Sequence, residues 1–177
     1  MIYLLFSTLA FLCLLVSDYF QISQKRLVVI PFSIAGYGGI VLVIIAMTIR
    51  YWVPTESVSF LLLKCFLVFL SLAALVYILF VEIPLSPQIQ ESSERFVVNT
   101  GTYALVRHPA FYPFILILVS LSFLAWDRAF IQYSLYLILL DFLLILVEDL
   151  FVFPGIFANY DIYKSKVPFL IPRKLRT

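Results

Sequence analysis

The sequence predicts an all-α integral membrane protein, a bundle of about five transmembrane helices. Two observations predict this fold class: a very apolar composition and a series of apolar runs of similar length. Hydrophobic residues make up 64% of the 177 residues and charged residues only 12%, against roughly 25% charged residues in an average soluble domain. The mean hydropathy is +1.10. A compact chain of this length has too little interior to bury so much apolar surface, which excludes a water-soluble monomer and a disordered chain.

Five apolar runs follow one another, each close to the ~20 residues that a helix needs to cross the hydrocarbon core. They cover residues 2–20, 27–49, 58–81, 111–126 and 130–147. The first run has no basic leading segment and no small-residue cleavage motif, so we expect a retained helix and not a signal peptide. The fourth and fifth runs are joined so closely that we expect an antiparallel helix hairpin. We therefore predict a single membrane domain over 1–177, with three N-terminal helices in 1–85 and a more polar half in 86–177.

The basic residues predict the orientation of the chain. Nine of the twelve Lys and Arg residues would lie on the side that carries the 20–26 loop, the 82–110 loop and the C-terminal tail. Arg50 and Arg128 would lie on the other side, and Lys64 falls within the third run. The positive-inside rule then places the C-terminus in the cytoplasm and the N-terminus outside. Because the chain has no extension beyond these runs, we expect a multi-pass protein of a prokaryotic plasma membrane.

Metal chemistry finds no support in the sequence. Cys13 and Cys65 lie inside apolar runs and are typical of small buried hydrophobic residues. His108 is the only histidine. With two distant cysteines and one histidine, no spacing typical of metal ligands exists, so we expect no metal site.

Ionisable residues within or at the ends of the apolar runs need a partner or a function, because a charge at mid-bilayer costs roughly 2.5–3.5 kcal/mol. Asp141 and Glu148 are two helical turns apart and therefore share one face of the fifth helix. Glu148 lies near its cytoplasmic end, where it can reach a pocket formed by the two polar regions, 86–109 and the stretch after 153. The alternative for Glu148 and Asp149 is a solvated helix end. For Lys64, we favour a side chain that extends to water over a pair with Asp141.

Arg107 and His108 precede the fourth run directly and predict an anion-binding corner. Pro109 biases His108 away from helical geometry and suits the first turn of a helix. The free N–H groups and the dipole at a helix start favour an anion, and the Arg107 guanidinium fits a carboxylate or a phosphate. The alternative is that the Arg–His pair binds lipid headgroups.

The polar stretch after the fifth run holds a second group of candidates. Pro154 and Gly155 are expected to break the helix. Tyr160 and Tyr163 are three residues apart, on one face of a short amphipathic helix that Pro168 helps to end. Their rings can anchor the chain at the membrane interface or present π faces to a cation.

These two blocks, in this order and at this separation, resemble the isoprenylcysteine carboxyl methyltransferase (ICMT) family and the related phospholipid methyltransferases of membranes. The shared pattern is Gly-x-Tyr-x-x-x-Arg-His-Pro from Gly101, then an acid pair at Glu148, then Tyr-x-x-Tyr and a Val-Pro ending. The resemblance covers about residues 86–173, half of the chain. It implies a cytoplasmic C-terminal cofactor-binding segment for S-adenosylmethionine. It also implies methyl transfer to a lipophilic acceptor from the bilayer, either a prenylcysteine-like carboxylate or another lipid O, N or S nucleophile.

The resemblance also implies the residues of the site. Arg107, His108 and Glu148 take the catalytic roles. The residues implied in cofactor binding are Gln88, Arg95, Phe96, Val97, Val98, Tyr103, His108, Pro109, Ala110, Phe111, Glu148, Tyr160 and Tyr163. Leu144 stands where family members that act on prenylcysteine carry an arginine, which favours a different lipophilic acceptor here.

Two other functions fit parts of the pattern. An NADPH-dependent membrane reductase of the sterol-reductase type shares the Arg-His-Pro motif and a similar tail, but such proteins have more helices and a Lys-Tyr-Gly-x-x-Trp stretch that this sequence lacks. A non-catalytic membrane protein would use the basic tail to bind anionic lipid. In each case we expect membrane lipids and no nucleic acid as partners, while the identity of the acceptor and the oligomeric state stay open.

Overall fold

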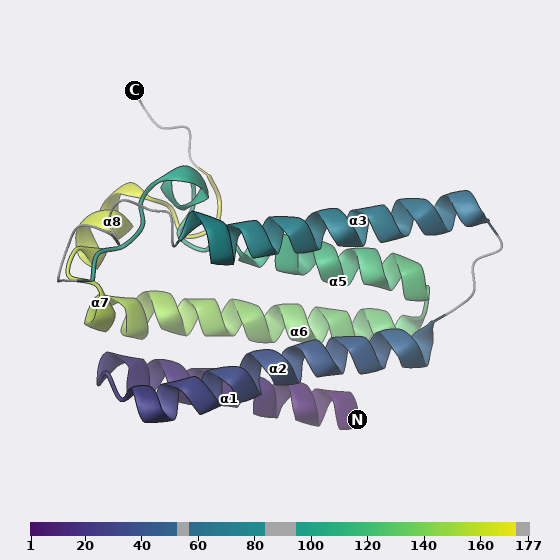
Figure 1. Cartoon of the computed structure of the whole chain (residues 1–177), viewed down its shortest axis with the longest axis horizontal. Helices are drawn as coiled ribbons and strands as arrows, with labels where there is room; N and C mark the ends of the chain where they lie inside the picture. The colour runs from purple at the N-terminus through teal and green to yellow at the C-terminus, as the bar shows by residue number, and fades with distance from the viewer. Residues whose placement is uncertain (53–56, 84–94, 173–177) are drawn as a thin grey trace.

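The computed structural model describes residues 1–52, 57–83 and 95–172 of the chain, and all regular elements in these ranges are helical. Five long helices lie side by side, and the short C-terminal elements pack together at one end of the bundle (Figure 1). The long helices are α1 (Ile2–Ile22), α2 (Arg26–Tyr51), α3 (Val58–Val76), α5 (Phe111–Ala125) and α6 (Arg128–Val147). The shorter elements are the π-helical η1 (Tyr77–Glu82), the 3₁₀ turn η2 (Gly101–Ala104), the π-helical η3 (Glu148–Val152), α7 (Phe153–Ile156) and α8 (Tyr160–Lys166).

Each of the five apolar runs forms a helix, with ends within a few residues of the prediction. Three helices are long and apolar enough to cross a membrane: Ile2–Ile22, Arg26–Arg50 and Val58–Glu82. The last of these includes η1, which continues α3 without a break. The apolar helix α5 has 15 residues and is shorter than the length that crosses a bilayer upright. The chain is therefore an all-helical protein with the features of a membrane protein.

The outer faces of the helices are apolar, as contact with lipid requires. On α3 and η1, the side chains of Phe69 and Phe80 are 68% and 71% exposed. Soluble monomers rarely leave large contiguous apolar surfaces in water. The buried core is formed by other apolar side chains, and Met47, Leu118 and Leu137 have no exposed surface at all.

The two N-terminal helices pack very closely through glycine. A Cβ atom on Gly36 of α2 would lie 2.6 Å from Leu14 Cγ and 3.0 Å from the carbonyl oxygen of Ala10, both on α1. Gly39 is similarly close to Ala10, at 3.0 Å from its Cβ. Small residues allow this approach, which is a common way for helices to associate in membranes.

The predicted hairpin between the fourth and fifth helices is confirmed. Trp126 takes a left-handed backbone conformation (φ 48°) after α5. The Asp127 carboxylate then caps α6 by accepting hydrogen bonds from the N–H groups of Ala129 (2.8 Å) and Phe130 (3.0 Å). Such a cap satisfies donors that a helix start leaves free.

The predicted helix break at Pro154-Gly155 is wrong. The backbone passes from α6 through the wider turn of η3 into α7, and Pro154 lies in the first turn of α7. A proline is tolerated there because its missing N–H has no partner in a first turn. The chain leaves the helix at Phe157, whose backbone is extended (φ −108°, ψ 122°).

The close contact of α1 and α2 generates a matched test. We expect Gly36→Ala to destabilise the protein by about 1–3 kcal/mol, because its Cβ would overlap a buried leucine. Gly38→Ala on the same helix serves as the control, since nothing lies within 4 Å of its Cβ position. Thermal unfolding in detergent measures both variants, and equal melting temperatures for the two would contradict the close packing.

Candidate active site

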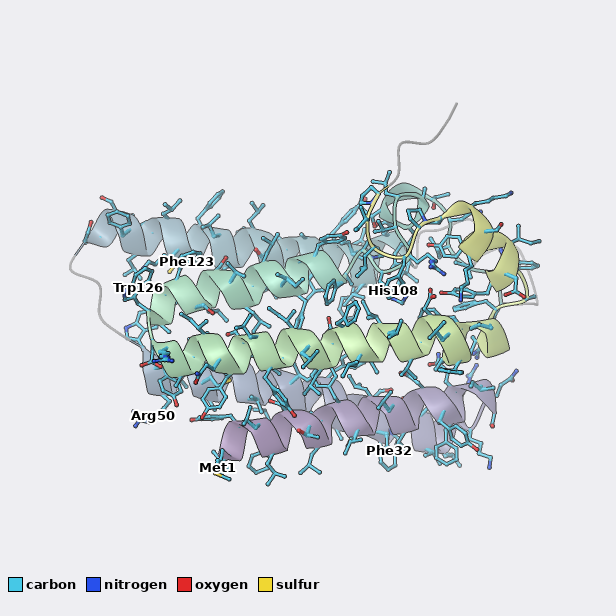
Figure 2. All side chains as sticks on the ribbon, turned by 180° about the vertical axis from the view of Figure 1, so that it is seen from behind. Met1, Phe32, Arg50, His108, Phe123 and Trp126 are labelled. Carbon is cyan, nitrogen blue, oxygen red and sulfur yellow. The ribbon has the colours of Figure 1, made fainter. Side chains whose placement is uncertain are left out.

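Two sequence blocks that lie about 40 residues apart meet at one end of the bundle. Arg107 and His108 immediately precede α5, and Glu148 and Asp149 immediately follow α6. Because α5 and α6 form an antiparallel hairpin, the start of one helix and the end of the other lie at the same end. Figure 2 shows His108 at the end of the molecule opposite Arg50.

Asp149 is the centre of a buried ion network. Its side chain is 4% exposed, and Nη1 of Arg107 lies 2.9 Å from each of its carboxylate oxygens. The Tyr160 hydroxyl donates a hydrogen bond of 2.5 Å to Oδ1, and Lys164 Nζ lies 3.4 Å from Oδ2. These partners come from different segments, so this one carboxylate joins α8 to the segment before α5. The alternative that Asp149 is a solvated helix end is thereby excluded.

The charge state of Asp149 follows from the same partners. Burial alone would raise its pKa. Donor groups on His108 and Tyr160 and the charges of Arg107 and Lys164 outweigh burial and lower the pKa of Asp149 to about 2. Asp149 is therefore ionised over the physiological range, and it neutralises the guanidinium that was expected to face an external anion.

His108 is buried between two phenylalanine rings. Its side chain is 6% exposed, it stacks on Phe153 at 5.6 Å, and the edge of Phe169 meets it at 5.1 Å. Nδ1 lies 3.8 Å from an oxygen of Glu148, and Nε2 lies 3.6 Å from Asp149. Both separations exceed hydrogen-bond length, and the buried Nε2 has no hydrogen-bond partner among the residues that the structure describes. Nε2 therefore faces the Asp149 carboxylate at the distance of a long ionic contact.

The imidazole of His108 is neutral at pH 7. Burial lowers its pKa below 6.5, and the neighbouring Asp149 carboxylate offsets this only in part. A neutral imidazole offers one donor and one acceptor, so His108 can bind a polar group or accept a proton.

Glu148 keeps its carboxylate available. Its side chain is 15% exposed, and its nearest ionic neighbour is His108. In the described ranges 1–52, 57–83 and 95–172, no hydrogen bond engages this carboxylate, in contrast to the adjacent Asp149. Burial and the nearby Asp18 and Asp141 raise the pKa of Glu148 well above its ordinary 4.5. The two neighbouring acids therefore differ: Asp149 is ionised and binds protein groups, whereas Glu148 favours its neutral form and is not engaged by a hydrogen bond from the described residues.

The segment that carries Arg107 is held from two sides. The Tyr163 hydroxyl donates to the carbonyl oxygen of Tyr103 at 2.7 Å. The N–H of Arg107 donates to the carbonyl oxygens of Pro168 (3.0 Å) and Phe169 (3.2 Å). The Arg107 guanidinium also lies over the Phe169 ring, at 5.5 Å. The C-terminal segment thus covers the site directly.

The segment from Arg95 to Val98 lies against the residues that precede α8. The carbonyl oxygen of Arg95 accepts from the N–H of Ala158 (3.1 Å), and the N–H of Val97 donates to the Asn159 side chain (2.9 Å). Val97 and Val98 are buried, Phe96 is half-buried and Arg95 is exposed. This segment is therefore near the other block, although two of its backbone groups are engaged by the protein itself. Gln88 lies outside the described residues.

The remaining predicted residues lie at the start of α5 and on α8. The helix begins at Phe111 with Ala110 as its cap, two residues after Pro109, and all three lie next to His108 in the chain. Tyr160 and Tyr163 are 2% and 5% exposed and form a small core with neighbouring valines. Buried rings cannot anchor the chain among lipid headgroups, so these tyrosines support the site from behind.

The interactions of Asp149, Phe153 and Phe169 were not predicted from the sequence. The sequence did mark Asp149 as a candidate for the site, since it is an ionisable residue beside an apolar helix. It did not distinguish Phe153 or Phe169 from the other phenylalanines, because phenylalanine is common throughout this chain. The suggested pair between Lys64 and Asp141 is absent from the described part of the structure.

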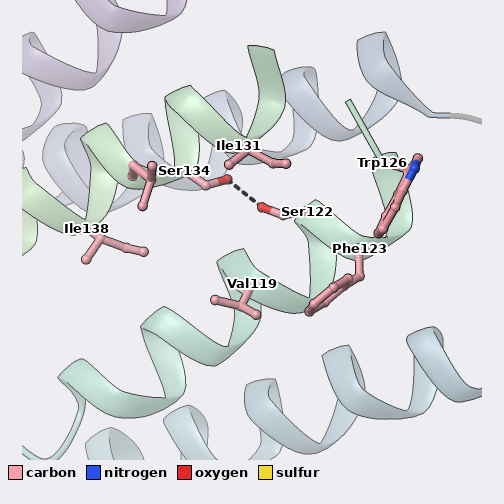
Figure 3. Close-up of a pocket in the computed structure, with 8 residues that line it drawn as sticks. Val119, Ser122, Phe123, Trp126, Ile131, Ser134 and Ile138 are labelled. Atoms are coloured by element: carbon pink, nitrogen blue, oxygen red, sulfur yellow. Dashed lines mark hydrogen bonds between the residues drawn. The ribbon is translucent and has the colours of Figure 1, made fainter. Parts of the chain in front are cut away.

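A separate apolar pocket lies between α5 and α6, towards the end of the hairpin that carries Trp126 (Figure 3). Its lining residues are Val119, Ser122, Phe123, Trp126, Ile131, Ser134, Leu135 and Ile138. The two serine hydroxyls bind each other at 3.1 Å. No residue that lines this pocket is titratable in the physiological range.

The buried ion network predicts a specific response to acid. Because the folded-state pKa of Asp149 lies below its ordinary 3.8, its ion pairs stabilise the fold above about pH 4, and this contribution is lost as the pH falls towards 2. We expect Asp149→Asn to be less stable than wild type by about 3 kcal/mol at neutral pH. The difference should narrow by about 2 kcal/mol between pH 6 and pH 2.5. Thermal unfolding at several pH values measures this difference in stability, with the exposed Asp161→Asn as the control. A stability difference that does not change with pH would contradict the network.

Comparison with protein-family models, with curated proteins and with solved structures finds no match to this chain. The function is therefore inferred from the residues of the site and from their chemistry.

Proposed function

We propose that this chain is an integral membrane S-adenosylmethionine-dependent methyltransferase that acts on a lipophilic acceptor at the cytoplasmic face of the membrane. The observation that carries the proposal is the meeting of Arg107 and His108 with Glu148 at one end of an apolar bundle, where no hydrogen bond from the described residues engages His108 Nε2 or the Glu148 carboxylate. These are the residues that the methyltransferase resemblance implies.

The available groups fit the cofactor. S-adenosylmethionine supplies a methyl group activated on a sulfonium, together with an ammonium, a carboxylate and ribose hydroxyls. The free carboxylate of Glu148 can accept hydrogen bonds from the ammonium or from ribose hydroxyls. His108 can donate to the carboxylate, and so can the unpartnered Nε of Arg107.

The protein groups contribute alignment, exclusion of water and proton transfer. Methyl transfer is an in-line displacement, so most of the rate comes from holding the reacting groups in register. Phe153 and Phe169 exclude water around His108. A carboxylate or thiolate acceptor needs no general base. For an amine acceptor, the neutral His108 or the free Glu148 carboxylate is positioned to take the proton.

The proposed membrane arrangement uses all five long helices as spans, with the α5–α6 hairpin completing the bundle. The turn between α1 and α2 lies at the same end of the bundle as α8, and the start of α6 lies at the other end (Figure 1). This turn carries Lys25 and Arg26, and α6 begins at Arg128. This distribution supports a cytoplasmic site under the positive-inside rule. We further propose a prokaryotic plasma membrane. The apolar outer faces of the helices suit an acceptor that reaches the site from the bilayer, whether prenylated or another lipid nucleophile.

The charges near the site favour this function over a nicotinamide-dependent reductase. A reductase that binds NADPH needs free cations for the pyrophosphate and the 2′-phosphate. Arg107 and Lys164 both contact Asp149, whose charge compensates theirs. The lipid-binding alternative depends on a basic tail, and residues 173–177 lie outside the described part of the chain.

Labelling of introduced cysteines tests the orientation. In a variant with Cys13 and Cys65 replaced by alanine, we expect Arg128→Cys to react with a membrane-impermeant maleimide on intact cells. Ser165→Cys should react only after the cells are permeabilised. Both positions are exposed. Reaction of both from the same side would contradict a membrane crossing by α6, and the reverse pattern would contradict the orientation.

Calorimetric titration of the detergent-purified protein tests the cofactor. We expect saturable binding of S-adenosylhomocysteine and none of NADPH. Glu148→Gln should weaken binding by about 10-fold to 100-fold, because a charge-assisted hydrogen bond is lost. Asp161→Asn, an exposed acid on α8, is the matched control and should bind as wild type. Binding of NADPH alone would favour the reductase, and binding of neither compound to folded protein would overturn the proposal.

A further inference from the structure

Glu82 at the end of η1 binds the turn that leads to the site. Its Oε1 accepts a hydrogen bond of 2.5 Å from the N–H of Thr102, and its Oε2 accepts one of 2.6 Å from the Thr102 hydroxyl. Both carboxylate oxygens are thus used on one residue of η2. Two charge-assisted hydrogen bonds to the same partner fix its orientation as well as its position.

The adjacent Gly101 is adapted to this contact. Its backbone has a φ of +58°, which glycine adopts without strain. A Cβ atom at this position would lie 2.9 Å from the Glu82 Cδ, and closer still to one of its oxygens. The glycine therefore leaves space for the carboxylate to reach the backbone of Thr102.

The contact continues into the candidate site. Tyr103 follows Thr102 directly, and its carbonyl oxygen is held by the Tyr163 hydroxyl at 2.7 Å. The N–H groups of Leu105 and Val106 then donate back to the carbonyl oxygen of Thr102, at 3.1 and 3.3 Å. Arg107 comes next in the chain. The turn fixed by Glu82 is therefore the start of the segment that presents Arg107 and His108.

We infer that Glu82 is a positioning residue: from the end of the third long helix, it fixes the turn at Thr102 and thereby sets the place of the Arg107–His108 corner. Glu82 lies before residue 86, outside the half of the chain that carries the methyltransferase resemblance. The inference gives the N-terminal helices a direct part in building the site. It rests on the proposed function for its ligand, but the contact itself does not depend on that function.

Binding of S-adenosylhomocysteine to the full-length protein in detergent tests this role. We expect Glu82→Ala to weaken binding about tenfold. Thr102→Ser keeps both donors and should bind as wild type, whereas Thr102→Val loses the hydroxyl and should bind more weakly. In a double-mutant cycle, Thr102→Val should add little to Glu82→Ala, because both changes break the same contact.

A control separates positioning from a general loss of stability. Asp127→Ala removes the cap at the opposite end of α6 and should lower the melting temperature while leaving the affinity unchanged. Equal affinities for Glu82→Ala and Asp127→Ala would overturn the inference.

If wild type binds no S-adenosylhomocysteine, the proposed function fails, and hydrogen exchange alone then tests the positioning role. Faster exchange over residues 101–107 in Glu82→Ala, but not in Asp127→Ala, supports it, and unchanged exchange overturns it.

Discussion

The buried charge of Asp149 is the constraint on which the polar end of this protein depends. An isolated carboxylate in an apolar environment is very costly, and the cost is offset only when charged and hydrogen-bonding partners surround it. Here the partners come from the segment before α5 and from α8. Elements as short as η2, α7 and α8 are not stable alone. Tyr160 and Lys164 attach α8 to this one ionised group, Glu82 holds η2, and α7 continues η3.

The helices were predictable from the sequence because lipid leaves little choice of structure. Backbone groups in hydrocarbon must be satisfied within the segment, so an apolar run of sufficient length forms a helix. The ends were predictable where a polar group begins the next helix, as Asp127 does for α6. The error at Pro154 has a different origin. Proline and glycine usually end a helix, but the wide turn of η3 changes the phase so that Pro154 enters a new first turn.

The site was predictable as a set of blocks but not as a set of contacts. The hairpin of α5 and α6 requires Arg107 and His108 to approach Glu148 and Asp149. Successive residues of an α-helix point about 100° apart around the helix axis, so only one of two adjacent acids can face Arg107. The π-helical turn of η3 changes this angle. The sequence therefore could not decide that Asp149 takes the guanidinium and Glu148 stays free. The contacts of Phe153 and Phe169 with His108 depend on tertiary packing, which local patterns do not encode.

This division between the two acids determines which ligand charge the site favours. Arg107 would attract an anion if it were unpaired, but Asp149 already compensates it at 2.9 Å. Glu148 lies beside a neutral histidine and has no cation as a partner in the described part of the chain. Burial and the nearby Asp18 and Asp141 raise the pKa of Glu148 well above 4.5, so this acid ionises readily only when a cation lies beside it. A ligand that carries an ammonium favours the ionised form of Glu148, whereas Arg107, already paired with Asp149, has little charge left to attract a phosphate.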